Sequence, residues 1–210
     1  PLASLIGSTE VALRRPRRAE DLQDLLGSHL EDLRRISLIV QDMAFLSQAE
    51  RGAQARRERV DSLAGLARAV ADLHEAFADE AGVLLAVQGD AAAAVDARLL
   101  QRALANLLGN ALRHAERGST VRVVIAAVGP EAVLTVHNHG PRIDPVHLPR
   151  LFDRFFRGDP ARADSARHHG LGLAIVAAIA RMHGGRTVAR SQDGWAEVGF
   201  TVPGLPAVRP

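Results

Sequence analysis

The stretch HHGLGLAIVAAIARMHGG, residues 168–185, places two glycines around one leucine and continues as an apolar run that a second glycine pair closes. The run is typical of a buried helix, so Gly170 and Gly172 stand where that helix begins. The unpaired N–H groups and the dipole of a helix N-terminus favour anions such as phosphate. The stretch is therefore either a phosphate-binding loop or a buried helix with a flexible entrance. Residues elsewhere in the chain distinguish these two interpretations.

Two common phosphate-binding motifs are excluded. A dinucleotide fingerprint needs a third glycine at a set distance and a strand before it, and the stretch has neither. A P-loop needs a lysine, and the chain of 210 residues contains none, so that all 26 of its basic residues are arginines.

The composition limits the classes of partner. The arginines are nearly balanced by 24 acidic residues, and the formal net charge is +2. Nucleic-acid binding requires a clustered basic excess, so we expect no nucleic-acid partner. Cysteine is absent, which excludes disulfides and thiolate metal sites. The longest apolar run lies within Leu171–Ala180 and is too short to cross a bilayer, so we expect membrane contact only through segments absent from this chain.

The N-terminal part of the chain is predicted to form a helical hairpin. Residues 2–13 and 19–50 have helical periodicity, and Pro16 lies in the turn between them. The second helix carries a seam with heptad-like spacing, made of Leu22, Leu26, His29, Leu33, Ile36, Val40 and Met43. This apolar surface is too wide for two helices, so we expect a homodimer through residues 1–50 that forms a four-helix bundle. The alternative is that the seam packs on the rest of the chain.

A second domain of mixed helices and strands follows a polar linker at residues 51–58. Because strands and helices do not alternate regularly, the fold class is predicted to be α+β, with helices layered on one face of a mixed sheet. The expected helices are 62–79, 96–115 with Asp96 as its cap, and one from about Leu171; the expected strands are 83–87, 121–128, 132–138, 186–191 and 196–202. The tail at residues 203–210 is expected to be loose.

The helix at residues 96–115 carries a polar face. Asn106, Asn110, Arg113 and His114 share that face, and leucines occupy the opposite one. A carboxamide oxygen suits Mg²⁺, and an arginine and a histidine one turn further along suit phosphate oxygens. A solvent-facing polar stripe would give the same pattern.

Three further segments lie between this helix and the glycine stretch. Asn138 stands at a strand end before Gly140, where its amide could bond an adenine edge. LFDRFFRGD, residues 151–159, gathers half of the phenylalanines of the chain. Residues 157–169 are polar and free of aromatic side chains, which suits a mobile lid.

The order Asn-x-x-x-Asn-Ala, Asn-x-Gly, phenylalanine-rich box and Gly-Leu-Gly-Leu resembles the N, G1, F and G2 boxes of bacterial sensor histidine kinases. PLASLIGSTEVAL, residues 1–13, is similar to the segment that follows the phosphoacceptor box in their heavy-metal-sensing subgroup. The resemblance implies a dimerisation and phosphotransfer hairpin at residues 1–52. It also implies an ATP-binding catalytic domain at residues 58–203, an α/β sandwich of the histidine kinase, gyrase, Hsp90 and MutL type.

The resemblance also implies roles for single residues. Asn110 would hold Mg²⁺, Asn106 would support the phosphate site, and Arg113 and His114 would approach the phosphates of ATP. Asn138 would read adenine beside Gly140, and Arg157 would belong to the lid. The expected ATP-binding set is completed by Ile143, Gly170, Leu171, Gly172 and Leu173.

Three positions depart from the family pattern. Asn138 replaces the usual aspartate, Arg142 replaces a glycine of the G1 box, and His168 replaces the first glycine of the G2 box. Pro1 matches the proline just after the phosphoacceptor box, so we expect the phosphoacceptor histidine to be missing from this chain. His29, at a seam position of the second helix, is interpreted as a packing residue.

The resemblance implies a protein-histidine kinase of a two-component system. Its γ-phosphoryl group would pass from ATP to a histidine, and then to an aspartate of a response regulator. The chain would be the cytoplasmic portion of a bacterial inner-membrane sensor. The alternatives are a non-catalytic nucleotide-binding or dimerisation module of the same fold and a gyrase- or MutL-type ATPase. A transition-metal site is disfavoured, because the nine histidines form no chelating pattern.

Overall fold

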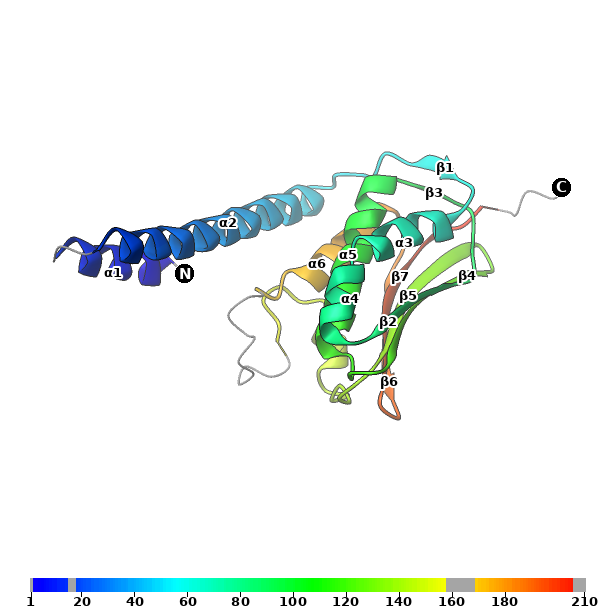
Figure 1. Ribbon diagram of the computed structural model, residues 1–210. Helices are drawn as coiled ribbons and strands as arrows, with labels where there is room; N and C mark the ends of the chain where they lie inside the picture. The colour runs from blue at the N-terminus through cyan, green and yellow to red at the C-terminus, as the bar shows by residue number, and fades with distance from the viewer. Residues whose placement is uncertain (1, 15–17, 158–168, 206–210) are drawn as a thin grey trace. The chain divides into compact units, whose positions relative to one another are not determined.

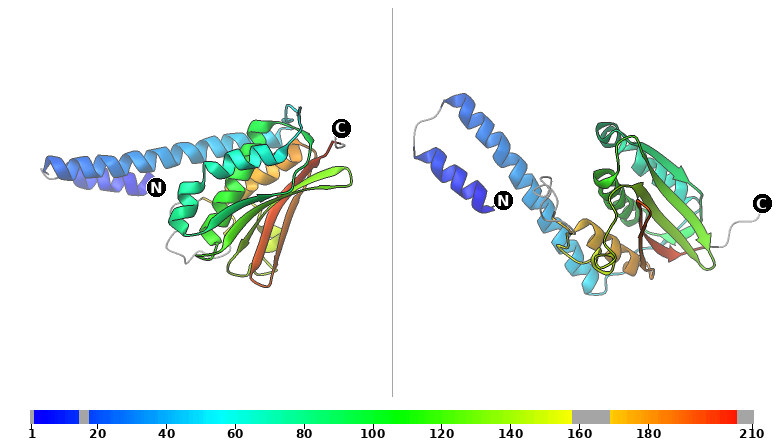
Figure 2. Two further views of the ribbon diagram at one scale, coloured as in Figure 1. Left: turned by 45° about the vertical axis from the view of Figure 1, so that its right-hand side comes forward. Right: turned by 90° about the horizontal axis from the view of Figure 1, so that it is seen from below.

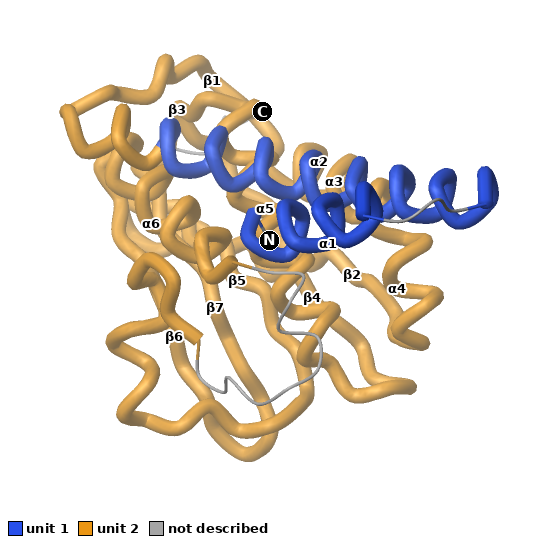
Figure 3. The backbone as a smooth tube through the Cα atoms, turned by 90° about the vertical axis from the view of Figure 1, so that its left-hand side faces the viewer, with its two compact units in different colours: residues 1–45 blue, residues 46–210 orange. Residues whose placement is uncertain are grey.

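The structure, a computed structural model, describes residues 2–14, 18–157 and 169–205 (Figure 1). The segment 158–168, which holds most of the expected lid and His168, lies outside the described residues, as do Pro16 and the end of the tail. The chain divides into two compact units, residues 1–45 and 46–210, and each is considered by itself (Figure 3).

The first unit contains helix α1, Leu2–Leu13, and most of helix α2, Ala19–Glu50. The two predicted helices are thus present, side by side, and a hydrogen bond of 2.8 Å joins Ser8 Oγ on α1 to His29 Nε2 on α2. No residue of α1 is buried, and Leu46, the buried residue of α2, belongs to the second unit. The apolar side chains of the hairpin are therefore largely open to solvent within one chain.

The second unit contains the remaining elements. In chain order they are β1 Glu58–Val60, α3 Leu63–Asp72, α4 Glu75–Ala81, β2 Leu84–Gln88, β3 Ala93–Val95, α5 Ala97–His114, β4 Thr120–Val128, β5 Glu131–His139, the 3₁₀ helix η1 Leu148–Arg150, α6 Gly172–Met182, β6 Thr187–Gln192 and β7 Trp195–Pro203.

Five strands form one mixed sheet in the order β2-β4-β5-β7-β6, in which β2 and β4 are parallel and the other neighbours are antiparallel. Helices α3 to α6 cover one face of this sheet (Figures 1 and 2). Alternate side chains of β4, β5 and β7 point to that face and form the core with the helices, among them Val123, Leu134 and Phe200. The predicted α+β sandwich is confirmed.

The helix predicted over residues 62–79 is wrong as a single helix. Ser62 caps α3 by accepting a hydrogen bond from the Gly65 backbone, but α3 ends at Asp72 and α4 begins at Glu75. His74 lies between them with φ −103° and ψ 2°, and its Nδ1 donates to the Val70 carbonyl at 2.8 Å. The backbone therefore turns within a segment whose apolar periodicity continues unbroken. The pairing of β1 with β3 was also not predicted, because strands of three residues carry too little pattern.

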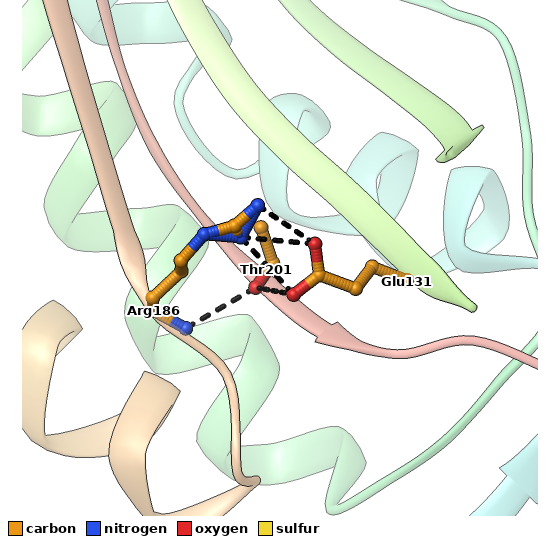
Figure 4. Close-up of polar contacts among 3 residues, drawn as sticks. All are labelled: Glu131, Arg186 and Thr201. Atoms are coloured by element: carbon orange, nitrogen blue, oxygen red, sulfur yellow. Dashed lines mark hydrogen bonds and ion pairs between the residues drawn. The ribbon is translucent and has the colours of Figure 1, made fainter. Parts of the chain in front are cut away.

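The end of the sheet at the start of β5 is held by a polar cluster (Figure 4). Arg186 Nη1 donates to both carboxylate oxygens of Glu131, at 3.1 and 2.9 Å. The buried Thr201 hydroxyl donates to Glu131 at 3.0 Å and accepts from the Arg186 backbone N–H at 3.1 Å. The cluster ties the start of β5 to β7 and to the segment that leads into β6.

Candidate functional site

Helix α5 carries the first group of candidate residues. Its leucines are buried against the sheet and the neighbouring helices, and Asp96 caps it by accepting from the backbone N–H groups of Arg98 and Leu99. Asn106 and Asn110 lie half-buried on the opposite face. Asn106 Nδ2 donates to the Arg102 carbonyl at 2.8 Å, and Asn110 Oδ1 receives a long contact of 3.4 Å from Arg113 Nη2.

The start of α6 meets this face directly. A Cβ atom at Gly172 would lie 2.7 Å from Asn106 Oδ1, closer than carbon and oxygen atoms approach in proteins. The asparagine carboxamide therefore rests against the glycine backbone, and the amide nitrogen bonded to Arg102 leaves the oxygen turned to the helix start. Two segments far apart in the sequence are joined at this point.

The N-terminus of α6 has no side-chain cap. Leu171, at the N-cap position, makes no capping hydrogen bond, and Leu171 itself is 3% exposed. Gly172 and Leu173 are half-buried in the first turn. Backbone N–H groups at such a start, together with the helix dipole, attract anions.

The end of β5 supplies the third part. Asn138 is 5% exposed and lies on the face of β5 that packs toward the helices. Gly140 is buried next to it, and a Cβ atom there would lie 2.1 Å from the His114 carbonyl oxygen at the end of α5. Only glycine permits this approach of strand end to helix end.

The segment after β5 returns to the same region. The half-buried Ile143 donates its backbone N–H to Ser191 Oγ at 3.0 Å. Gly170, with φ +67°, contacts the backbone of Phe155 and Phe156, and its carbonyl accepts from Phe155 N at 3.0 Å. Phe155 itself has φ +61°, so the phenylalanine-rich segment turns sharply where it meets the glycine stretch.

The charged candidates lie at the margin of this region. Arg113, His114 and Arg157 are exposed, and Arg157 borders the part that the structure does not describe. Arg142 is exposed as well. The structure therefore brings Asn106 against Gly172 and the end of α5 against Gly140.

A buried histidine, His183, connects α6 to α5. His183 is fully buried, donates through Nδ1 to the Ile179 carbonyl at 2.8 Å, and accepts through Nε2 from the Asp96 backbone N–H at 3.0 Å. This links the end of α6 to the cap of α5. Burial lowers the pKa of the His183 imidazole, Arg57 lowers it further, and the bond to Ile179 and the charge of Asp96 act in the opposite direction.

Sequence reasoning missed a second network next to Asn138. His139 Nδ1 lies 2.7 Å from Glu116 Oε2, and its ring meets Trp195 edge-on at 5.2 Å between centroids. Backbone hydrogen bonds join Glu116 to His139 and Gly140 to Gly194. The fixed end of β5 thus has its supports on α5 and on the β6–β7 turn, which no local pattern indicates.

Sequence reasoning also missed His74–Glu75, a histidine followed by an acid, which lies between α3 and α4 rather than in the hairpin. Among the described residues, no group of three or more histidine, cysteine and acidic side chains is arranged to hold a metal ion. Nor is any helix in the described ranges long and apolar enough to pass through a membrane.

Residues 95–206 match the family model described as histidine kinase-, DNA gyrase B- and HSP90-like ATPase. The sensor protein IrlS of Burkholderia pseudomallei is 40% identical over 185 residues, which cover 88% of this chain and 40% of IrlS. The sensor histidine kinase CusS of Escherichia coli is 43% identical over 194 residues, 92% of this chain and 40% of CusS.

The chain thus spans about 40% of the length of these curated relatives. Among solved structures, full-length ShkA in complex with AMPPNP is 26% identical and superposes with a TM-score of 0.72, covering 97% of this chain and 43% of ShkA. With the matched family model and the fold, these findings show that the chain belongs to the histidine kinase-, DNA gyrase B- and HSP90-like ATPases, as a member of the heavy-metal sensor histidine kinases that include CusS, CzcS and CopS.

Proposed function

We propose that this chain binds ATP with Mg²⁺ between α5, the end of β5 and the start of α6, and transfers the γ-phosphoryl group to a histidine outside the chain. The acceptor would then pass the phosphoryl group to an aspartate of a response regulator. The observation that carries the proposal is the contact between Asn106 Oδ1 and Gly172, where a Cβ atom would lie only 2.7 Å from the oxygen. It sets a polar carboxamide against a helix start without a side-chain cap, and such a helix start attracts phosphate groups.

The residues of the site fit a magnesium nucleotide. Among the described residues, the Asn110 carboxamide oxygen has one long contact, with Arg113 Nη2 at 3.4 Å, and it is the kind of hard oxygen ligand that Mg²⁺ prefers. Bound there, the ion would neutralise phosphate charge. Asn106 and the backbone N–H groups just before and within the first turn of α6, from Gly170 to Leu173, would orient the phosphates.

The remaining side chains have complementary roles. Arg113 and Arg157 would supply positive charge around the phosphates, since the chain has no lysine, and His114 would approach the phosphates as a hydrogen-bonding group. Asn138 would bond the base, with Gly140 and Ile143 forming the wall beside it. Reaction would depend mostly on positioning and charge neutralisation, because phosphoryl transfer needs little covalent help from protein groups.

The hairpin would serve the same reaction. Residues 1–50 would pair with a second copy, and in the whole protein the bundle would present the acceptor histidine. The chain would be the cytoplasmic portion of a bacterial inner-membrane sensor, and a response regulator would be the partner that receives the phosphoryl group.

Calorimetry tests the nucleotide site. The chain should bind ATP, and Mg²⁺ should tighten binding. Asn110→Ala should remove the Mg²⁺ effect, whereas Gln101→Ala, on the same helix but nearer its start, should keep it. An Asn110→Ala protein that retains the full Mg²⁺ effect would exclude this asparagine as the metal ligand. Failure to bind millimolar ATP would favour the non-catalytic module.

A further inference from the structure

The Asn138 carboxamide is enclosed but has no protein partner. The residue is 5% exposed, and within the described residues no hydrogen bond involves its side chain. Among the described residues, every side-chain nitrogen or oxygen that is completely shielded from solvent has a hydrogen-bond partner. The amide atoms of Asn138 therefore keep a small accessible surface, although the side chain as a whole is buried.

The backbone under this amide is firmly held. Gly140 N donates to the Gly194 carbonyl at 2.9 Å, and Glu116 N donates to the His139 carbonyl at 2.8 Å. The Glu116 carboxylate also meets the His139 ring at 2.7 Å. The backbone that carries the carboxamide is thus held, but no hydrogen bond to a described residue fixes which of its two ends, oxygen or nitrogen, meets a ligand.

The two ends recognise opposite partners. The oxygen accepts a hydrogen bond, as from the 6-amino group of adenine, and the NH₂ group donates one, as to the 6-carbonyl of guanine or hypoxanthine. A carboxylate at this position could only accept, and its charge would oppose a carbonyl oxygen in an enclosed site. An asparagine has no charge and can present its NH₂ group, so the repulsion that would reject a 6-oxopurine is absent.

We propose that Asn138 makes this site tolerant of the purine 6-position, so that GTP and ITP bind there beside ATP. The inference rests on the proposed nucleotide site and specifies its substrate class as purine nucleoside triphosphates rather than ATP alone.

Calorimetry on the full chain in Mg²⁺ buffer tests the proposal with ATP, GTP and ITP. ITP carries the 6-carbonyl without the 2-amino group of guanine and therefore isolates the contact with Asn138. Both GTP and ITP should bind within about tenfold of ATP, the scale of one neutral hydrogen bond. In Asn138→Asp, the preference for ATP over both 6-oxopurine nucleotides should widen by a further tenfold or more, roughly the effect of one charged contact.

The control is Gln88→Glu, which exchanges an exposed amide for an acid at the end of β2 and should leave the three affinities in their original ratio. A wild-type chain that rejects ITP and GTP as strongly as Asn138→Asp does would overturn the inference and leave ATP binding intact. If Asn138→Asp does not fold, the wild-type ratio of ITP to ATP decides alone, and a ratio beyond a hundredfold refutes tolerance. Absence of binding by all three nucleotides would overturn the proposed site itself.

Discussion

At the residue scale, the absence of a Cβ atom at two glycines allows the close contacts of the candidate site. Gly172 and Gly140 admit an oxygen of Asn106 and of the His114 backbone at distances that any side chain would block. The two positions differ in what they would displace. At Gly172 the neighbour is the tip of a side chain that can move, whereas at Gly140 it is a backbone carbonyl that cannot.

Gly172→Ala should therefore fold and yet bind ATP less well. The added methyl group pushes the Asn106 carboxamide away from the start of α6, and loss of one such contact corresponds to about tenfold in affinity. The measurement is ATP affinity together with urea unfolding. The control is Gly109→Ala, inside α5, where a Cβ atom meets only Arg113 Nη1 at 3.8 Å. It should stabilise the helix by roughly 0.5–1 kcal/mol and leave affinity unchanged. Equal affinities in the two variants would contradict the assigned contact.

His183 should make stability depend on pH. Its pKa is lowered in the folded chain from 6.5, chiefly by burial, so folding favours the neutral ring. The corresponding stability is present above pH 6.5 and is lost as the pH falls through the folded pKa. Burial lowers the pKa of His137 too, which adds a contribution of the same sign.

His183→Gln can keep the bonds to Ile179 and Asp96 but cannot titrate. Imperfect geometry should cost about 1–3 kcal/mol at neutral pH. Urea unfolding at about pH 7.5 and 5.5, on either side of the histidine range, should show a smaller drop in stability for the variant than for the original chain. The same drop in both would mean that His183 does not titrate as inferred.

At the element scale, the hairpin buries few of its apolar side chains within one chain. Large apolar side chains of α1 and α2 remain exposed, including Ile6 at 54%, Leu26 at 65% and Leu33 at 51%. Each square ångström of such surface removed from water contributes about 25 cal/mol, which favours association with a second copy.

We expect light scattering to give twice the mass of one chain. The double variant Leu26→Arg and Leu33→Arg should be monomeric, because it places charges in the seam, and so should a chain that begins at Arg56. Gln23→Arg, exposed on α2 and outside the seam, should remain dimeric. A monomeric original chain would refute the proposed bundle.

At the scale of the whole molecule, we propose that the acceptor histidine lies outside the ATPase-like domain and outside the described part of the hairpin. The hairpin histidine, His29, is bonded to Ser8, and His74, which precedes an acid, bonds Val70 between α3 and α4. An acid next to a histidine can assist proton transfer, but by itself this does not place the histidine close to the γ-phosphate of ATP.

With ATP labelled at the γ-phosphate, the chain alone should gain no acid-labile label. Addition of a separate hairpin that carries a histidine in the phosphoacceptor box should yield label on that hairpin, slowly, because an untethered acceptor loses effective concentration. Label on the chain alone would contradict this expectation, and its loss in His74→Ala or His29→Ala would identify the acceptor.

The amino-acid sequence by itself determined the local features of this protein. The leucine periodicity of α5, its cap at Asp96 and the alternation in β4 and β5 follow from interactions within a few residues, so the α+β class could be predicted. The glycine at 172 could be recognised as a helix start, and Asn106 as one member of a polar face.

Only the tertiary structure decided which of these features meet. Three contacts join residues that are distant in the chain: Asn106 with Gly172, Gly140 with His114, and Asp96 with His183. The burial of Asn138 without a hydrogen-bond partner among the described residues is likewise a tertiary feature. Their geometry depends on how helices pack on the sheet, which periodicity does not encode. The break at His74 has the same origin, since a tertiary turn there overrides a helical pattern that continues through it.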